Sequence, residues 1–212
     1  MRFYKNDMSF YKNCYKEMKL FNKWTYKKIK IKDFSLSQYI FMNYEFGDFI
    51  PHSKGKFGNA AFAKSKCSII ERFINSLMQQ GRNSGKKIKA INIVKKAFSL
   101  INQKTNINPI QVLVTAIENC SPIEDSLSLG QKISNKRVSV DVSPYRRISQ
   151  AIYMIAVGIK KASFKSEKSI SDCICEEILN AYKKSSSRYL IIIISYGIRK
   201  KEEIERVAEL SR

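Results

Sequence analysis

Apolar residues in the middle of the chain recur at intervals of three and four, which places them on one face of an α-helix. The first of these stripes follows Ser68, and Glu71 stands where a capping box requires it, so both side chains are expected to bond amides of the first turn. Gly81 tolerates a positive φ and is expected to follow the end of this helix. The predicted inward residues are Ile69, Ile70, Phe73, Ile74, Leu77 and Met78.

Two more helices are predicted before residue 120. The second covers about residues 87–103. The third begins after Asn108, because Asn is a strong helix cap and Pro109 suits the first helical position, and Gln111 can return the capping bond. The residues expected to face the core are Ile88, Ile91, Val94, Ala97, Phe98 and Ile101 in the second helix, and Ile110, Leu113, Val114 and Ile117 in the third.

The period of the pattern changes from that of a helix to that of a strand after the third helix. Val138, Val140 and Val142 alternate with polar residues, and β-branched residues at this spacing favour a strand. The pattern therefore predicts a two-stranded β-ribbon at about residues 129–142, with its turn near Ser134.

Helical spacing returns after the ribbon. One helix starts at Ser143-Pro144, another starts at Ser169 with Asp172 as its capping partner, and the last covers about residues 201–210. The apolar run at residues 189–194 is predicted to be buried, because an exposed β-prone run favours aggregation. The predicted fold is mainly α, a bundle of about six helices with a projecting two-stranded ribbon and an N-terminal extension.

Residues 1–66 differ from the helical domain predicted at residues 67–212, and they are expected to form a basic, aromatic N-terminal extension. Aromatic and basic residues interleave in this extension, and helical periodicity is weak. Lysine and isoleucine alternate over residues 28–32, so residues 28–33 favour either a short strand or an extended arm. One helix is predicted within residues 34–44. Residues 51–66 have the composition of a loop that carries lysines.

The charge of the chain narrows its possible partners. Lys and Arg number 39 against 18 Asp and Glu, which gives a formal net charge of +21 and a pI near 9.8. Because such a chain repels itself, a polyanion is the expected partner, with nucleic acid first and an anionic membrane surface second. The apolar run at 189–194 is far shorter than the roughly 20 residues that span a bilayer, and the start lacks the apolar core of a signal peptide. No predicted helix has the faces of a membrane-surface anchor, which disfavours a membrane partner.

The sequence offers no supported catalytic, cofactor or metal site. His52 is the only histidine and lies in a Lys-rich segment, so a base paired with a nucleophile is not expected. The five cysteines include no Cys-x-x-Cys pair, which predicts reduced, structural thiols of the cytosol. The glycines of residues 81–87 are too closely spaced for a Walker motif, and Lys87 stands where Ser or Thr is needed. The sequence therefore predicts no catalytic residues, no cofactor and no metal ligands.

The excess positive charge gathers in clusters that predict contacts with nucleic-acid phosphates. Residues 81–87 form a basic turn before a helix, and the free amides of a helix N-terminus favour phosphate. Arg146 and Arg147 lie in the first turn of a helix, where cations oppose the macrodipole, so an external phosphate is expected to neutralise them. A solvated basic face is the alternative interpretation. The other clusters are Lys54, Lys56, Lys64 and Lys66, then Lys132, Lys136 and Arg137, and then Lys160 and Lys161.

Several ordered motifs are similar to those of one family. Residues 138–148, Val-Ser-Val-Asp-Val-Ser-Pro-Tyr-Arg-Arg-Ile, resemble a motif that ends Val-Asp-Val-Ser-Pro-x-Arg-Arg. Residues 67–72, 81–87 and 108–114 match further motifs at the right spacing. From about Lys19 onward the chain resembles the universal small-subunit ribosomal protein seven in its eukaryotic cytosolic form, called S five e in the older scheme.

This resemblance implies a structural protein of the cytoplasmic small ribosomal subunit and not an enzyme. Family members bind the 3′ major domain of the small-subunit ribosomal RNA, nucleate assembly of the subunit head, and lie among neighbouring head and platform proteins. The ribbon would lie near the exit-site transfer RNA and the messenger RNA exit, with Ile133, Ser134, Asn135 and Lys136 at its tip. Together with the charge clusters, the resemblance predicts that the residues in contact with ribosomal RNA are Lys54, Lys56, Lys64, Lys66, Arg72, Gly81, Arg82, Asn83, Lys86, Lys87, Lys132, Lys136, Arg137, Arg146 and Arg147.

Two alternatives belong to other functional classes. A free basic RNA- or DNA-binding protein with a regulatory role would carry the same charge. It would stay in the light fractions of a sucrose gradient, whereas a ribosomal protein sediments with the small subunit. A nucleotide-dependent RNA-modifying enzyme is the third hypothesis, which the lack of a base, a metal site and a true phosphate loop disfavours.

Overall fold

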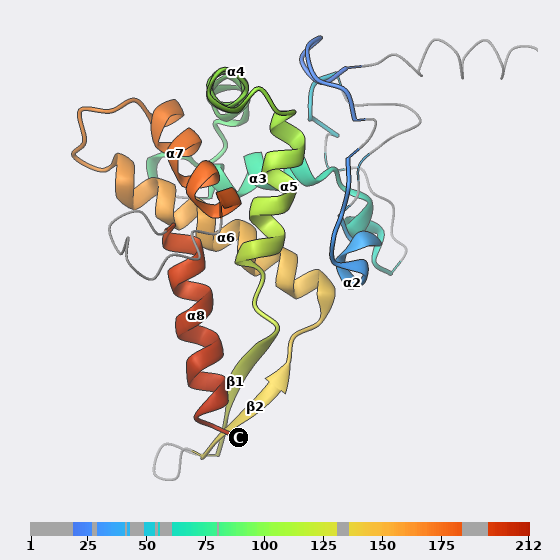
Figure 1. Ribbon diagram of the computed structural model, residues 1–212, viewed down its shortest axis with the longest axis vertical. Helices are drawn as coiled ribbons and strands as arrows, with labels where there is room; N and C mark the ends of the chain where they lie inside the picture. The colour runs from blue at the N-terminus through green and yellow to red at the C-terminus, as the bar shows by residue number, and fades with distance from the viewer. Residues whose placement is uncertain are drawn as a thin grey trace, which may run out of the picture.

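Helices packed around one apolar core form the body of the molecule, and a two-stranded ribbon projects from one end of it (Figure 1). The computed structural model describes residues 19–26, 29–40, 42, 49–53, 55, 61–79, 81–130, 136–183 and 195–212. The predicted fold class, a mainly helical bundle with a projecting ribbon, is confirmed. The predictions for residues 189–194, for the ribbon tip at 131–135, and for Lys54 and Lys56 fall outside the described residues.

Most helices lie where the apolar stripes predict them, and the last one begins earlier. The helices are α2 (Phe34–Ser37), α3 (Ile69–Met78), α4 (Lys87–Thr105), α5 (Pro109–Cys120), α6 (Pro144–Ser163), α7 (Ile170–Lys183) and α8 (Tyr196–Glu209), with short 3-10 helices η1 (Ala63–Lys66) before α3 and η2 (Gly81–Asn83) before α4. The sequence pattern predicts that the last helix starts near residue 201, but it starts at Tyr196. Ser195 sets this start, because its Oγ accepts a hydrogen bond from the Ile198 N–H at 3.2 Å.

Two of the predicted helix caps are confirmed. Asn108 Oδ1 accepts a hydrogen bond from the Ile110 N–H at 3.1 Å at the start of α5. Ser169 Oγ accepts one from the Asp172 N–H at 3.3 Å at the start of α7. Each bond satisfies an amide that has no partner within the helix, so these two helix starts follow from local sequence alone.

The capping box predicted for α3 is wrong. Ser68 is the N-cap residue, but its Oγ has no hydrogen-bond partner among the described residues. Glu71 instead accepts a hydrogen bond from Lys87 Nζ and another from the Ser53 N–H, the latter at 3.0 Å. A cation of the next helix therefore takes the carboxylate that the local pattern assigns to the helix start.

The inward face of α4 also differs from its prediction at one position. Ile88 is 73% exposed, whereas Ile91 and Val94 are buried. One helical turn before Ile91 lies Lys87, and its half-buried side chain takes the inward position beside Glu71. At the first turn of α4 the residue that faces the body is thus Lys87, paired with Glu71, and Ile88 faces solvent.

The core joins the helices to the first described segment of the chain. Trp24 lies edge-on against Phe98 of α4, with ring centroids 5.7 Å apart. Leu20 and Leu36 are fully buried and belong to the same apolar cluster as the helices. The described part of residues 1–66 therefore shares the core of the helical body.

Residues 29–33 lie extended along α5. Of the two predicted alternatives, a short strand and an extended arm, the structure shows the arm. The Gln111 amide bonds the backbone of Lys30 twice, because Oε1 accepts from the Lys30 N–H at 2.7 Å and Nε2 donates to the Lys30 carbonyl at 2.9 Å. Two turns along the same helix face, Glu118 Oε1 accepts from the Lys32 N–H at 2.7 Å. Gln111 therefore holds the arm and does not return the capping bond expected of it.

The ribbon consists of β1 (Glu124–Leu129) and β2 (Lys136–Asp141), which pair antiparallel as predicted. It begins earlier than the predicted residues 129–142. Leu127 and Leu129 alternate with serines, so they continue the period of 2 that the valines of β2 show on the other strand.

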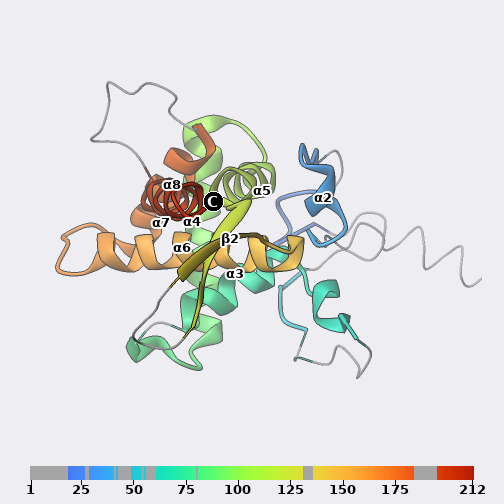
Figure 2. The ribbon, with the colours of Figure 1, turned by 90° about the horizontal axis from the view of Figure 1, so that it is seen from below.

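Helix α8 supports the base of the ribbon. The Ile123 N–H donates to Glu205 Oε1 at 3.0 Å, and Arg212 after the helix pairs with Glu124 of β1. Seen from the ribbon end, α8 lies end-on beside the ribbon while α6 runs behind it (Figure 2). The direction of the ribbon is thus set by contacts with a helix that follows it in sequence.

Candidate nucleic-acid interface

The cations predicted to contact RNA divide into an exposed group and a group held inside the protein. The exposed cations are Lys64, Lys66, Arg82, Lys86, Arg137 and Arg146, and Gly81 and Asn83 are exposed with them. Arg146 Nη2 lies 3.8 Å from Asp125 Oδ2 of the ribbon, and 71% of the Arg146 side chain is exposed. Outside the described residues lie Lys54, Lys56, Lys132, Ile133, Ser134 and Asn135, and the side chain of Lys136.

The turn before α4 presents its polar groups to solvent. Gly81 and Gly85 have φ values of +61° and +75°, a backbone conformation that other residues rarely adopt. Ser84 Oγ closes the turn by donating to the Gly81 carbonyl at 3.1 Å. Arg82 and Lys86 are thereby exposed directly before α4, where the partial positive charge of the helix N-terminus adds to theirs. A phosphate group is the ligand that this arrangement favours.

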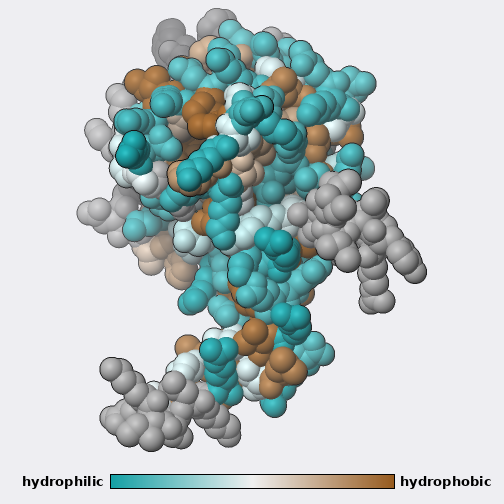
Figure 3. Space-filling model, turned by 90° about the vertical axis from the view of Figure 1, so that its left-hand side faces the viewer, coloured by the Kyte–Doolittle hydropathy of each residue, from teal (hydrophilic) through white to brown (hydrophobic). Residues whose placement is uncertain are grey.

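Two lysines that are not among the residues predicted to contact ribosomal RNA lie near this turn, and one of them, Lys160, belongs to a basic cluster noted in the sequence. Lys89 is exposed on α4, and Lys160 is exposed in the last turn of α6. A Cβ atom on Gly81 would stand 4.0 Å from Lys160 Nζ, so the end of α6 lies close to the turn. The sequence shows Lys160 only as part of a basic pair. The packing of α6 on α3 and α7 brings it near the turn. The side of the molecule that includes the end of α6 is largely hydrophilic, and apolar side chains are exposed on the ribbon (Figure 3).

Arg147 belongs to the group held inside the protein, with 11% of its side chain exposed. Its Nε donates to the Pro122 carbonyl at 3.1 Å, its Nη1 to Ser35 Oγ at 2.9 Å, and its Nη2 to Asp33 Oδ2 at 3.0 Å. Hydrogen bonds from Ser35 and Arg147 lower the pKa of the Asp33 carboxyl, so an ionised carboxylate faces the guanidinium. The carboxylate of Asp33 therefore supplies the negative charge that the first turn of α6 needs beside Arg147, where the sequence predicts an external phosphate.

Arg72 and Lys87 are also engaged within the protein. Arg72 Nη2 donates to Ser149 Oγ at 2.8 Å, and its guanidinium lies over the Tyr145 ring, 4.7 Å from the centroid. Lys87 pairs with the buried carboxylate of Glu71. These cations fasten α3 to α6 and to α4, and thereby fix the turn that carries the exposed cations.

The described residues show no second kind of site. No group of three or more His, Cys, Asp or Glu side chains among them could hold a metal ion. No helix in the described part of the chain is long and apolar enough to cross a membrane. Burial raises the pKa of Cys67 and of Cys120 to about 12, which keeps these thiols protonated and unreactive. The described free and buried cysteines are Cys67, Cys120, Cys173 and Cys175.

One comparison with known protein families covers most of the helical body. The family model described as Ribosomal protein S7p/S5e matches residues 46–212. The chain belongs to the ribosomal protein S7p/S5e family. The predicted family is thereby confirmed, and the protein is a structural, non-enzymatic constituent of the small ribosomal subunit that acts in translation and binds ribosomal RNA and other ribosomal proteins.

Membership of the S7p/S5e family gives the basic surface a class of partner. The matched region includes the turn before α4, the ribbon and the start of α6, while the arm at residues 29–33 lies before it. A free regulator and an RNA-modifying enzyme no longer fit, because the family is a structural one of the small subunit. In this S7p/S5e chain the exposed cations are the candidates for contact with small-subunit RNA.

Proposed function

We propose that the turn before α4, with the other exposed cations, holds the backbone of the 3′ major domain of small-subunit ribosomal RNA. The exposure of Arg82 and Lys86 at the N-terminus of α4, close to Lys160, carries this proposal. The net charge of +21 supports it, because a polyanion relieves the self-repulsion of the chain. The proposed contact residues among the described ones are Lys64, Lys66, Gly81, Arg82, Asn83, Lys86, Arg137 and Arg146.

Binding at this surface nucleates assembly of the head of the small subunit in the cytoplasm, and it leaves the ribbon free to extend beyond the body. The ribbon then faces the exit-site transfer RNA and the messenger RNA exit with its tip at residues 133–136. The projection of the ribbon from the helices and the exposure of Arg137 support this part of the proposal (Figure 1). Neighbouring head and platform proteins contact the remaining surface.

Most of the contacts are made with phosphate and ribose groups. Helical RNA has a deep, narrow major groove that side chains cannot read and a shallow minor groove, so a rigid basic surface recognises its shape. Each phosphate that a cation neutralises releases counterions, and the logarithm of the binding constant then falls linearly with the logarithm of the salt concentration. The salt dependence therefore counts the phosphates that the protein contacts.

A salt titration tests this proposal. The purified full-length chain is titrated with the 3′ major domain RNA at several salt concentrations, and the slope of the double-logarithmic plot should be about −0.7 to −0.9 per phosphate. Replacing Arg82 and Lys86 together with Ala should lower the magnitude of the slope by about 1–2. The matched control replaces Lys95 and Lys96, which are exposed cations of α4 beyond the turn. Equal slopes for the two double variants would remove the turn from the interface.

A further inference from the structure

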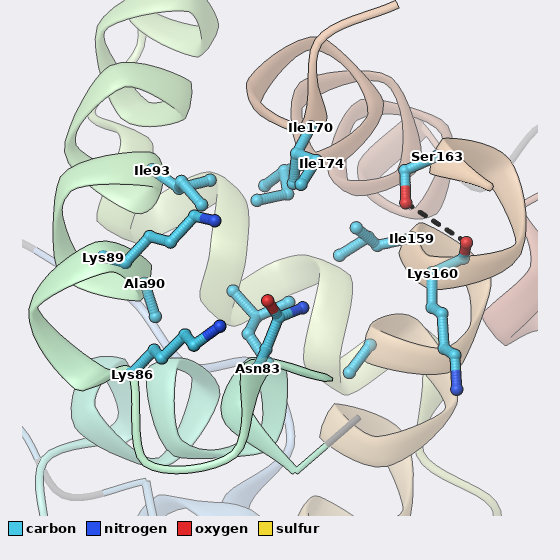
Figure 4. A pocket seen from close by; sticks show the side chains of 12 residues that line it. Asn83, Lys86, Lys89, Ala90, Ile93, Ile159, Lys160, Ser163, Ile170 and Ile174 are labelled. Carbon is cyan, nitrogen blue, oxygen red and sulfur yellow. Dashed lines mark hydrogen bonds between the residues drawn. The ribbon is translucent and has the colours of Figure 1, made fainter. Parts of the chain in front are cut away.

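A small hollow opens between the start of α4, the end of α6 and the first turn of α7 (Figure 4). Its inner wall is apolar and includes Ala90, Ile93, Ile159 and Ile174. It offers about 70 Å³ of room. A single water needs roughly 10–15 Å³ and several polar partners. The hollow therefore has room for more than one water, but its apolar walls offer water few partners.

The mouth of the hollow is polar and positively charged. The amino groups of Lys86, directly before α4, and of Lys89 in its first turn reach toward it, and the amide of Asn83 lies between them and the opposite wall (Figure 4). All three residues are exposed, and no Asp or Glu is among the described residues that line the hollow. The occupant that fits has an apolar part for the walls and a negative charge at the mouth.

We propose that this hollow takes up one unstacked nucleobase of the ribosomal RNA, with the adjoining phosphates on Lys86 and Lys89. This inference rests on the proposed function, because Asn83 and Lys86 belong both to the turn before α4 and to the mouth of the hollow. An RNA backbone that lies on Arg82 and Lys86 brings its own bases to the opening, and no second partner is needed. The aliphatic walls receive the faces of the ring.

Asn83 supplies the polar contact that such a base requires. A side-chain amide offers both a donor and an acceptor, and it can pair with the donor and acceptor on the edge of a base. Proteins that read RNA sequence do so mainly at unstacked bases of loops and bulges, because the grooves of the helix hide base identity. The hollow is therefore the place where this basic, shape-recognising surface can distinguish one nucleotide from another.

Filling the hollow tests the inference. Ala90 lines it from α4, so the variant Ala90→Leu occupies the space, and Ala162→Leu adds the same side chain at an exposed position near the end of α6. The full-length chains are titrated with the 3′ major domain RNA, and the bases and the backbone are probed chemically at single-nucleotide resolution. Ala90→Leu should weaken binding by about 5- to 100-fold, the range of one specific base contact. It should expose one base that the wild-type chain protects, while the neighbouring backbone stays protected.

A second variant keeps the test decisive if Ala90→Leu does not fold. Asn83→Ala changes an exposed side chain and should expose the same base, whereas Asn92→Ala, at an exposed position of α4, should not. If the wild-type chain binds the RNA and neither Ala90→Leu nor Asn83→Ala alters the affinity or the base protection, the hollow holds no base. Capture of an acidic peptide there with unchanged RNA protection would overturn the inference in the same way. If the wild-type chain does not bind the RNA at all, the proposed function itself fails.

Discussion

At the scale of single residues, the nearest carboxylate decides which cations are available for RNA. Arg146 and Arg147 are adjacent and look equivalent in the sequence, yet one is 71% exposed and the other 11%. The partner of Arg147 is Asp33, which is 114 positions away in the sequence. No local pattern contains this pairing, so the clusters predicted the presence of a basic surface but not which of its members face outward.

The two arginines are expected to respond differently to substitution. Arg147→Ala should lower the free energy of unfolding by about 2–3 kcal/mol, because it leaves the partly buried Asp33 without its cationic partner. Arg146→Ala should change that free energy by less than about 1 kcal/mol but lower the magnitude of the salt slope by about 1. Urea unfolding measures the first quantity and RNA titration the second. If Arg147→Ala unfolds with the wild-type free energy and loses more of the salt slope than Arg146→Ala does, this assignment is wrong.

Glu177 makes stability depend on pH. Burial raises the pKa of its carboxyl, although the Gly197 N–H donates to Oε1 at 3.1 Å. A raised pKa means that the folded protein holds this proton more tightly than the unfolded chain does. The contribution of this group to stability is therefore complete below the ordinary value of 4.5 and is lost as the pH rises through the folded pKa.

The variant Glu177→Gln isolates this effect. It keeps an oxygen for the Gly197 N–H and carries no titrating group. The free energy of unfolding should therefore decline less steeply above about pH 4.5 than it does in the wild type, because the contribution of Glu177 is absent. Glu202→Gln, an exposed position on α8, is the control and should retain the wild-type profile. Denaturant unfolding at a series of pH values measures both. Superimposable profiles of the wild type and Glu177→Gln would show that burial does not perturb this carboxyl.

At the scale of elements, features that rest on local periodicity are predictable and those that rest on a distant partner are not. The start of α5 follows from Asn108 and the apolar stripe behind it. The role of Gln111 does not, because its partner Lys30 lies 81 positions away. The capping box of Ser68 and Glu71 fails for the same reason, since Lys87 from the next helix takes the carboxylate.

The arm along α5 should loosen when its clamp is removed. A hydrogen bond of this kind stabilises by about 0.5–1.5 kcal/mol, so Gln111→Ala should speed amide hydrogen exchange at Lys30 by roughly 2- to 10-fold. Gln103→Ala, at an exposed position of α4, should leave that amide unchanged. Exchange measured by NMR at Lys30 and Lys32 reports the result. If the Lys30 amide keeps its wild-type protection in Gln111→Ala, the arm is held by other contacts.

At the scale of the whole molecule, two sets of cations have separate tasks. The internal set, which includes Arg72, Lys87 and Arg147, fastens the helices and the arm to one another. The external set then sits on a rigid frame, with Lys160 of α6 close to the turn before α4. Composition and motifs predict the class of partner and the family, but the surface itself exists only after segments far apart in sequence have packed.

A density map of the small ribosomal subunit that contains this chain tests the central claim most directly. The side chains of Arg82 and Lys86 should contact phosphates of the 3′ major domain, and Arg147 should remain paired with Asp33 inside the protein. A map in which the turn before α4 faces solvent or another protein, with the RNA along a different surface, would contradict the account.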